Sequence, residues 1–561
     1  MTLLMEDSEP TEMEILVTKD MSVMKRYINI LMVALATMMT SCLTEDPRDQ
    51  LYEEDIYNNA NNIYINAVAV LYNYIGGSAD SEGLQGTCRG IYDYNTLTTD
   101  EAMIPIRGGD WYDGGLWTNM YQHKWSPNDL PLYNTWKYLY KVVVLSNKSL
   151  HIIDKYSHNL SEEQRVAYEA EVRALRALFY YYIMDMYGRV PIVTSYEQPQ
   201  DEVVQSERSE VFRFIVNELQ EVAELLPNER SNKMGNYYGR ITTPVANFLL
   251  AKLALNAEIY CDDNWTDGVP RNGKEIFFTV DGEKLNAWQT CIKYCNKLAE
   301  VGYRLEDDYS YNFSVHNENS NENIFTIPLD KNLYAAQFWY LFRSRHYNHG
   351  GALGGSSENG TSANISTVLA NGYGTDDVDA RFEKNFYAGI VEVDGKPVMM
   401  DNGQQLEYFP LELKLNLTGS SYVKTAGARM AKYEVDRTSH SDGRQPDNDI
   451  VLFRYADALL MKSEAKVRNG EDGSLELNEV RGRVGMPYRE ATLENILKER
   501  LLELVWEGWR RQDMVRFGVY HKSYDQRVQL ADEKNGYTTV FPIPQKSIDL
   551  NPKLKQNVGY K

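Results

Sequence analysis

The stretch SEEQRVAYEAEVRALRALFYYYIMDMYGRVP, residues 161–191, decides the fold class of this chain. Ser161 and Gln164 have the spacing of a capping box, which begins a helix by satisfying two otherwise unpaired backbone N–H groups. Alanine, leucine and tyrosine then recur every three or four residues and form an apolar stripe. Gly188 and Pro191 end the helix. Because the stripe contains many small residues, the stretch predicts a helix that packs closely against another.

The same pattern recurs on both sides of this stretch. It predicts helices at residues 58–74, 132–156, 212–226, 243–257, 288–298, 450–468, 475–484 and 492–517. Amphipathic helices joined by short connections cannot bury their stripes alone, so we expect antiparallel pairs that stack as in helical repeats. No strict repeat period is visible in the sequence.

Two regions lack the helical period. Residues 83–128 are rich in glycine and aromatic residues and are predicted to be a long functional loop region. Residues 307–446 combine Gly, Asn, Ser and Asp with short apolar runs such as 324–327 and 391–393, which predict loops with a few strands. The predicted fold class is therefore mainly α, with helix pairs in residues 42–300 and 301–561 and a loop-rich, partly β insert at 307–446.

The stretch MKRYINILMVALATMMTSCLTED, residues 24–46, predicts where the protein works. A basic start, an apolar run and a small-residue pair are typical of a secretory signal, and the run is too short for a spanning helix. The position of Cys42 resembles a bacterial lipobox, so residues 24–41 are predicted to be a lipoprotein signal peptide and Cys42 the lipidated residue. The alternative is an ordinary cleaved signal with a chance cysteine.

The residues beside this signal also carry information. Glu45 and Asp46 resemble the acidic export tag of Bacteroidetes lipoproteins. Residues 1–23 are acidic where a signal must be basic, so we interpret them as a misassigned start.

Composition excludes some classes of partner. The formal net charge is -22, so binding to nucleic acid or to an anionic membrane surface is not expected. The chain has 41 tyrosines and nine tryptophans, whose flat faces and polar edges suit capture of sugars or peptides, although part of this excess belongs to the core.

Cysteine and histidine give no metal signal. Spacing leaves the disulfide pairing of the four later cysteines open, and Cys291 and Cys295 have the spacing of two buried side chains on one helix face; the four are Cys88, Cys261, Cys291 and Cys295. His346 and His349 have no fixed third ligand and are interpreted as bystanders. No metal or cofactor is expected.

Several strings, in order along the chain, resemble the SusD/RagB family of outer-membrane lipoproteins. They are residues 171–177 (EVRALRA) with 187–191 (YGRVP), 323–325 (NIF), 379–381 (DAR), 453–457 (FRYAD) with 464–465 (EA), 477–485 (LNEVRGRVG), 499–500 (ER) with 507–510 (EGWR), and 542–544 (PIP) with 551–552 (NP) and 556–557 (QN).

This resemblance implies tetratricopeptide-like helix pairs with the irregular region presenting the ligand face. It also implies a non-catalytic protein, held on the cell surface at the outer membrane by its lipid anchor. Such a protein captures glycan and delivers it to a SusC-like TonB-dependent transporter. Capture of peptides or another nutrient by the same architecture stays open, as does, more remotely, a glycoside hydrolase, which needs two carboxylates across a sugar bond. The Glu/Arg series between 499 and 516 is interpreted as buried charge-assisted pairs and not as a ligand site.

Ligand residues can be nominated only by their chemistry, since the family's binding loops vary. Sugars stack an apolar C–H face on aromatic rings and bond their hydroxyls to paired donors and acceptors. Two aromatic stretches offer both kinds of group, and the predicted ligand-binding residues are Arg107, Asp110, Trp111, Tyr112 and Trp117 in the first and Tyr311, Trp339 and Tyr340 in the second. The competing interpretation is aromatic packing beneath long loops.

Overall fold

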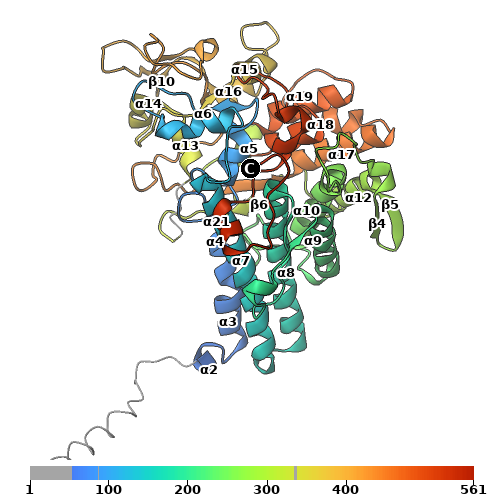
Figure 1. Ribbon diagram of the computed structural model, residues 1–561. Coiled ribbons are helices and arrows are strands. Elements are labelled where there is room, and N and C mark those ends of the chain that lie inside the picture. The colour runs from blue at the N-terminus through green and yellow to red at the C-terminus, as the bar shows by residue number, and fades with distance from the viewer. Residues whose placement is uncertain (1–52, 86, 334–337, 561) are drawn as a thin grey trace, which may run out of the picture. The chain divides into compact units, whose positions relative to one another are not determined.

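The computed structural model describes residues 53–85, 87–333 and 338–560 (Figure 1). The chain divides into two units, residues 1–56 and 57–561. The described part of the first unit is the short helix α2 (Glu53–Ile56). The stretch 1–23, interpreted as a misassigned start, the predicted signal at 24–41 and Cys42 all lie outside the described residues.

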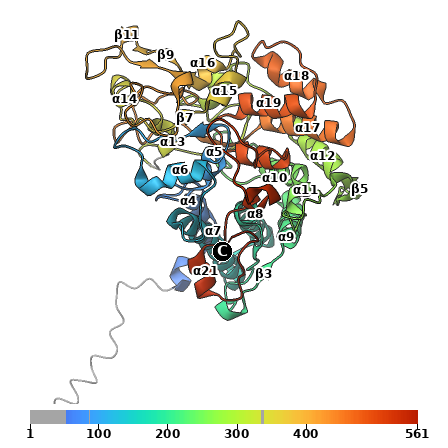
Figure 2. The ribbon, with the colours of Figure 1, turned by 45° about the horizontal axis from the view of Figure 1, so that its top comes forward.

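Helices packed side by side form the framework of residues 57–300 of the second unit (Figures 1 and 2). The helices are α3 (Ala60–Ile63), the π-helical η1 (Tyr64–Ala69), α4 (Val70–Gly76), α7 (Leu130–Lys155), α8 (Glu162–Tyr187), α9 (Arg208–Val222), α10 (Thr243–Leu255), α11 (Ala257–Tyr260) and α12 (Ala287–Glu300). Helix α7 packs on α8, α8 on α9, α9 on α10, and α10 on α12. Helices α7 and α8 run antiparallel, since Tyr187 at the end of α8 donates a 2.7 Å hydrogen bond to the carbonyl of Leu132 at the start of α7. The predicted stack of helix pairs is confirmed.

Helix α8 lies between α7 and α9 in this stack. The predicted capping box is present, with the side chain of Ser161 accepting from the N–H of Gln164, and Gly188 ends the helix at φ 70°. The predicted one-sided stripe is too narrow, because every residue from 174 to 187 is buried. The additional contacts come from the C-terminal part of the chain, where Gln512 accepts from the hydroxyl of Tyr181.

The C-terminal helices continue the stack. They are α17 (Tyr455–Asn469), α18 (Ser474–Arg483), α19 (Leu493–Leu504), α20 (Arg510–Arg516) and α21 (Gln545–Leu550), and α17 packs on α12. The single helix predicted for residues 492–517 is wrong, because the chain turns between α19 and α20. Trp506 there has a φ of +69° and donates its backbone N–H to the buried carboxyl group of Glu101 at 2.9 Å. Distant contacts thus override a helical pattern that is continuous in the sequence.

The region between residues 301 and 449 consists of loops, short helices and two-stranded sheets. Its strands are β6 (Asn323–Ile327), β7 (Ser362–Ala363), β8 (Phe386–Tyr387), β9 (Gly389–Ile390), β10 (Glu392–Val393), β11 (Lys396–Pro397), β12 (Glu407–Tyr408) and β13 (Arg429–Met430), and its helices include α13 (Trp339–Arg343), α14 (Tyr347–Ala352), α15 (Ile365–Ala370) and α16 (Phe382–Asn385). The partly β insert is confirmed. Strand β6 pairs antiparallel with β14 (Ile450–Arg454), which leads into α17 and so joins the insert to the helical stack.

Residues 83–128 contain more regular structure than predicted. They form α5 (Ile91–Leu97), β1 (Ala102–Met103) and α6 (Leu116–Tyr121). Strand β1 pairs with β7 of the insert, with Ala102 opposite Ala363. The aromatic stretch of this region is therefore held against the insert, although the two are far apart in the sequence.

Charged side chains fill the centre of the C-terminal half. Arg454 contacts Glu322 and Glu503 at 2.6 Å and Glu507 at 2.7 Å, and all four side chains are buried. Neighbouring arginines make the same kind of contact, such as Arg381 with Glu503 at 2.7 Å. The interpretation of the Glu/Arg series as buried ion pairs is confirmed.

Candidate functional site

Residues 107–115 form a turn that presents Trp111. The backbone N–H of Arg107 donates to the carbonyl of Asp110 at 3.0 Å, and Asp110 returns the bond at 3.2 Å. Trp111 and Asp113 follow with φ of +63° and +39°, a left-handed backbone conformation that residues other than glycine adopt at a cost in free energy. Such a conformation persists only where the surrounding contacts enforce it.

Arg107 supplies part of that enforcement. Its buried guanidinium donates to the carbonyls of Val423 and Ala426, each at 2.9 Å, and to the hydroxyl of Ser362 at 2.8 Å. Burial lowers the pKa of Arg107. Arg107 therefore ties the turn to the insert, and its buried position leaves little of it for a ligand.

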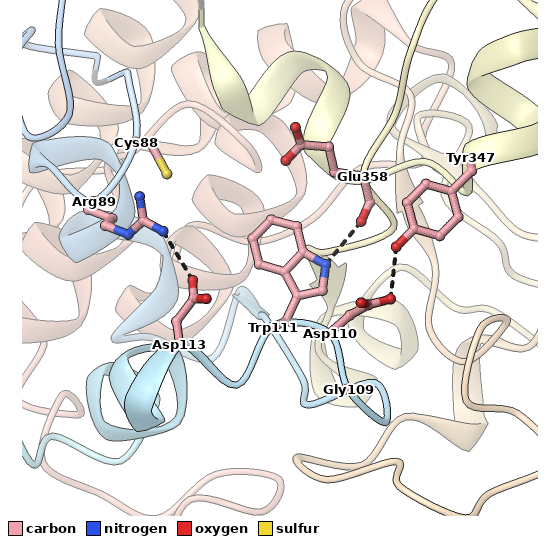
Figure 3. Close-up of a pocket in the computed structure, with 8 residues that line it drawn as sticks. All are labelled: Cys88, Arg89, Gly109, Asp110, Trp111, Asp113, Tyr347 and Glu358. Carbon is pink, nitrogen blue, oxygen red and sulfur yellow. Dashed lines mark hydrogen bonds and ion pairs between the residues drawn. The ribbon is translucent and has the colours of Figure 1, made fainter.

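A pocket of about 470 Å³, which we call the Trp111 pocket, opens at this turn (Figure 3). It is lined by Cys88, Arg89, Gly109, Asp110, Trp111, Asp113, Tyr347 and Glu358. The indole of Trp111 stands in the middle of this group in Figure 3. Its Nε1–H donates to the carbonyl of Glu358 at 2.9 Å. On the same side, the hydroxyl of Tyr347 donates to Asp110 at 3.0 Å. Residues of 88–113 and of 347–358, two stretches distant in the sequence, thus line one hollow.

A second tryptophan supports the first. Trp117 is buried and donates its Nε1–H to Asp113 at 2.8 Å. Its ring packs edge to face on that of Trp111, with the ring centroids 6.0 Å apart. The guanidinium of Arg343 lies 5.3 Å from the Trp117 ring and makes two hydrogen bonds, of 2.6 and 3.1 Å, to buried Asp93. The support is therefore rigid, while Trp111 keeps an exposed part of its ring.

The charges in the pocket are mostly negative. Of the eight lining residues, three carry carboxylates and one a guanidinium. The guanidinium of Arg89 contacts Asp113 at 3.1 Å and Asp80 at 2.6 Å. Burial raises the pKa of Glu358, and burial together with Asp110 raises that of Tyr347 to about 12, so the tyrosine is a neutral donor at neutral pH. The lining offers an aromatic face with several hydrogen-bond acceptors.

The predicted ligand residues fall into distinct environments. Asp110 and Trp111 line the pocket, whereas the neighbouring Tyr112 is 58% exposed and is not part of the lining. Arg107 and Trp117 are buried, which argues against direct contact with a ligand.

The second predicted group does not join this pocket. Tyr340 is buried and stacks on Tyr92 with ring centroids 4.1 Å apart, so it belongs to the core. Tyr311 is half-buried in the 3-10 helix η7 (Tyr309–Phe313) and is not a lining residue. Trp339 is the first residue of α13, and its side chain lies outside what the structure describes.

Sequence reasoning missed Cys88, Arg89 and Glu358 as lining residues. Arg89 follows a short run of small residues, and Glu358 lies in the glycine-rich stretch that ends at Gly360. That glycine permits close approach, since a Cβ there would lie 2.7 Å from the Trp111 ring. A charged residue within a small-residue loop was the signal available in both cases.

Cysteine and histidine make no other site in the described part of the chain. Cys88, Cys261, Cys291 and Cys295 are all free thiols, and among the described residues no three His, Cys, Asp or Glu side chains are placed to hold a metal ion. His349 is buried beside the hydroxyl of Tyr408 at 3.1 Å.

One family profile matches the N-terminal part of the chain and another matches the C-terminal part. The profile described as "SusD family" matches residues 363–560, and the profile described as "Starch-binding associating with outer membrane" matches residues 53–255. The chain belongs to the SusD family. None of the helices in the described residues of this SusD-family protein is long and apolar enough to cross a bilayer.

Individual relatives agree with the profiles over most of their length. The chain is 25% identical over 541 residues to the "Starch-binding protein SusD" of Bacteroides thetaiotaomicron, covering 87% of this chain and 89% of that protein. Among solved structures, a "Laminarin binding SusD-like protein" matches at a TM-score of 0.67 and 20% identity, covering 90% of this chain and 100% of that one. "Surface glycan-binding protein A" of B. thetaiotaomicron, solved with laminarihexaose, matches at 0.67 and 21%, covering 89% and 99%. These two structures show that the fold is shared.

Proposed function

We propose that this SusD-family protein is a non-catalytic lipoprotein that captures glycan at the cell surface. Cys42 carries the lipid anchor, and a SusC-like TonB-dependent transporter in the outer membrane receives the glycan. The observation that carries the proposal is the Trp111 pocket, where a partly exposed ring stands beside oriented carboxylates. An aromatic face stacks on the C–H face of a sugar, while carboxylates accept hydrogen bonds from its hydroxyls.

The family and its relatives support the ligand class. One profile's description names starch, and relatives are described as binding starch, laminarin or surface glycan. The acidic lining of the pocket is compatible with neutral sugars, which bring donors and no negative charge. Weak binding suffices for this role, because a lid anchored over a transporter delivers its ligand at high local concentration.

Binding to a panel of polysaccharides that includes starch and laminarin tests the proposal. The protein is prepared from residue 43 onward and examined by affinity electrophoresis and calorimetry. We expect at least one neutral glycan to bind without release of new reducing ends. Retardation by no glycan contradicts glycan capture, co-purified peptides indicate the peptide alternative, and turnover abolished by one Asp or Glu substitution indicates a hydrolase.

Anchoring and partner are tested separately in cells. Palmitate labelling of the wild type and of Cys42→Ala, with protease added to intact cells, reports lipidation and surface exposure. We expect labelled, protease-sensitive wild type, an unlabelled variant, and co-purification of a TonB-dependent barrel with the wild type. An unlabelled, protected wild type contradicts the cell-surface role.

A further inference from the structure

A second hollow of about 540 Å³ lies in the insert. Its lining includes Asn402, Gln404, Gln405, Glu407, Phe409 and Tyr422. These residues come from the 399–405 turn, from β12 and the residue that follows it, and from the segment 421–425, a region in which the sequence pattern nominated no ligand residue. We call this hollow the insert pocket.

The insert pocket offers groups suited to a sugar. The rings of Phe409 and Tyr422 are both partly exposed and lie 4.9 Å apart at an angle of 56°. Two exposed amides stand beside them, and the side-chain amide of Asn402 donates to that of Gln404 at 3.0 Å, which orients both. Rings with oriented amides provide the apolar face and the paired donors and acceptors that a glycan requires.

The insert pocket adjoins the Trp111 pocket. Tyr347 lines the Trp111 pocket, and the next residue, Asn348, donates its side-chain amide to the carbonyl of Met399 at 2.9 Å and to Asp401 at 3.0 Å. The 399–405 turn of the insert pocket is thereby attached directly behind Tyr347.

A second connection runs along the other wall. Lys424 lines the insert pocket, and its Nζ lies 5.6 Å from the centroid of the Tyr347 ring. Its neighbour Val423 also lines the insert pocket and accepts the hydrogen bond from Arg107 that fixes the turn carrying Trp111. Tyr347, which lines the Trp111 pocket, and Lys424, which lines the insert pocket, thus lie side by side between the two hollows.

We infer that the insert pocket is a further binding site for the same glycan chain, which passes over Tyr347 and Lys424 from one hollow to the other. The inference rests on the proposed function and adds a preference for long chains. Once one end is bound in the Trp111 pocket, contact with the insert pocket is intramolecular and costs little additional freedom. Affinity therefore rises with chain length until both hollows are filled.

A size series of oligosaccharides tests this, prepared from whichever polysaccharide the wild type binds and running from disaccharide to octasaccharide. Calorimetry compares the wild type with the double variant Phe409→Ala/Tyr422→Ala. Loss of aromatic anchors weakens the longest ligands by about ten-fold or more, while the shortest ligands bind within two-fold of the wild type. The variant Asn402→Ala/Gln404→Ala removes two exposed amides and one local bond, which the N–H of Gln404 donates to the Asn402 side chain at 3.0 Å. We expect it to weaken long ligands in the same selective way while the protein stays folded.

Phe277→Ala is the matched control, because Phe277 is 54% exposed on β4 (Phe277–Val280) and lines neither hollow. Equal affinity of both double variants and the wild type for every length overturns the inference and leaves glycan capture standing. An equal loss at every length overturns it as well. Absence of binding to the wild type overturns the proposed function, and the inference with it.

Discussion

Replacing Trp111 by alanine isolates the contribution of the partly exposed indole to glycan binding. Alanine retains a Cβ, so the strain at φ +63° does not change, and the turn should keep its shape because the hydrogen bonds of Arg107 that hold it do not involve the indole. The ring is partly covered already by Trp117 and by the backbone at Gly360, and a sugar can cover only the remainder.

The expected loss of affinity depends on the area of the Trp111 ring that a bound sugar covers. If a bound sugar covers about 80 Å² of ring at ~25 cal/mol per Å², the substitution removes ~2 kcal/mol, or about 30-fold in Kd. Trp111→Phe retains an aromatic face but loses the 2.9 Å hydrogen bond to the carbonyl of Glu358. Its affinity should therefore lie between that of the wild type and that of Trp111→Ala.

Calorimetry with the glycan that the wild type binds measures the effect, and thermal unfolding shows whether the fold is unchanged. Tyr196→Ala is the control, since this tyrosine is 47% exposed and does not line the pocket. Unaltered affinity of a well-folded Trp111→Ala protein would refute the assignment of the pocket. So would equal losses in Trp111→Ala and Tyr196→Ala.

Three further predictions concern charge. Arg454→Met leaves three buried glutamates without their shared partner and should cost about 3–5 kcal/mol in chemical denaturation; an unchanged midpoint contradicts a structural role. Glu101 has a pKa raised to about 8, first by burial, so the folded protein holds a proton that the unfolded chain releases. The free energy of unfolding should then fall as the pH rises from about 4.5 to 8. Thermal unfolding at a series of pH values measures this, and Glu101→Gln should lack the share of the decrease that comes from Glu101. Sulfated or uronic-acid oligosaccharides should bind several-fold more weakly than neutral ones of equal length, and Asp110→Asn/Asp113→Asn should narrow the gap; tighter binding of the anionic ligands would contradict the role of the acidic lining.

The sequence was most informative where short-range signals determine structure. The capping box at Ser161 and the glycine at 188 fixed the ends of α8 because both act within one helical turn. The turn between α19 and α20 gave no such signal. Trp506 adopts its positive φ where its backbone bonds to Glu101 and its indole N–H to the carbonyl of Asn385, partners 405 and 121 residues away. A periodic pattern cannot report partners so distant.

The site was predictable only in part for the same reason. Composition nominated Trp111, Trp117 and Tyr340 alike, since each is an aromatic residue in an irregular stretch. Their exposure depends on what the fold places against them, and Trp117 and Tyr340 are buried by residues from other segments. Arg89 and Glu358 reach the pocket from segments about 270 residues apart in the sequence, and neither stands next to an aromatic residue in the sequence that could have nominated it.

The buried arginines Arg107 and Arg343 hold the partly exposed Trp111 in place. Arg343 holds Asp93 beneath Trp117, and Arg107 holds the segment 423–426 against the turn, so the ring of Trp111 is fixed before any ligand arrives. A fixed ring loses little conformational entropy on binding, so more of each contact's free energy appears as affinity. Arg107 bonds to two backbone carbonyls and to Ser362, and Arg343 bonds to Asp93 and Thr361, so exposed residues of the turn can change without disturbing either arginine. Substitution of exposed turn residues should therefore change which glycan is bound, whereas substitution of Arg107 or Arg343 should weaken every ligand together.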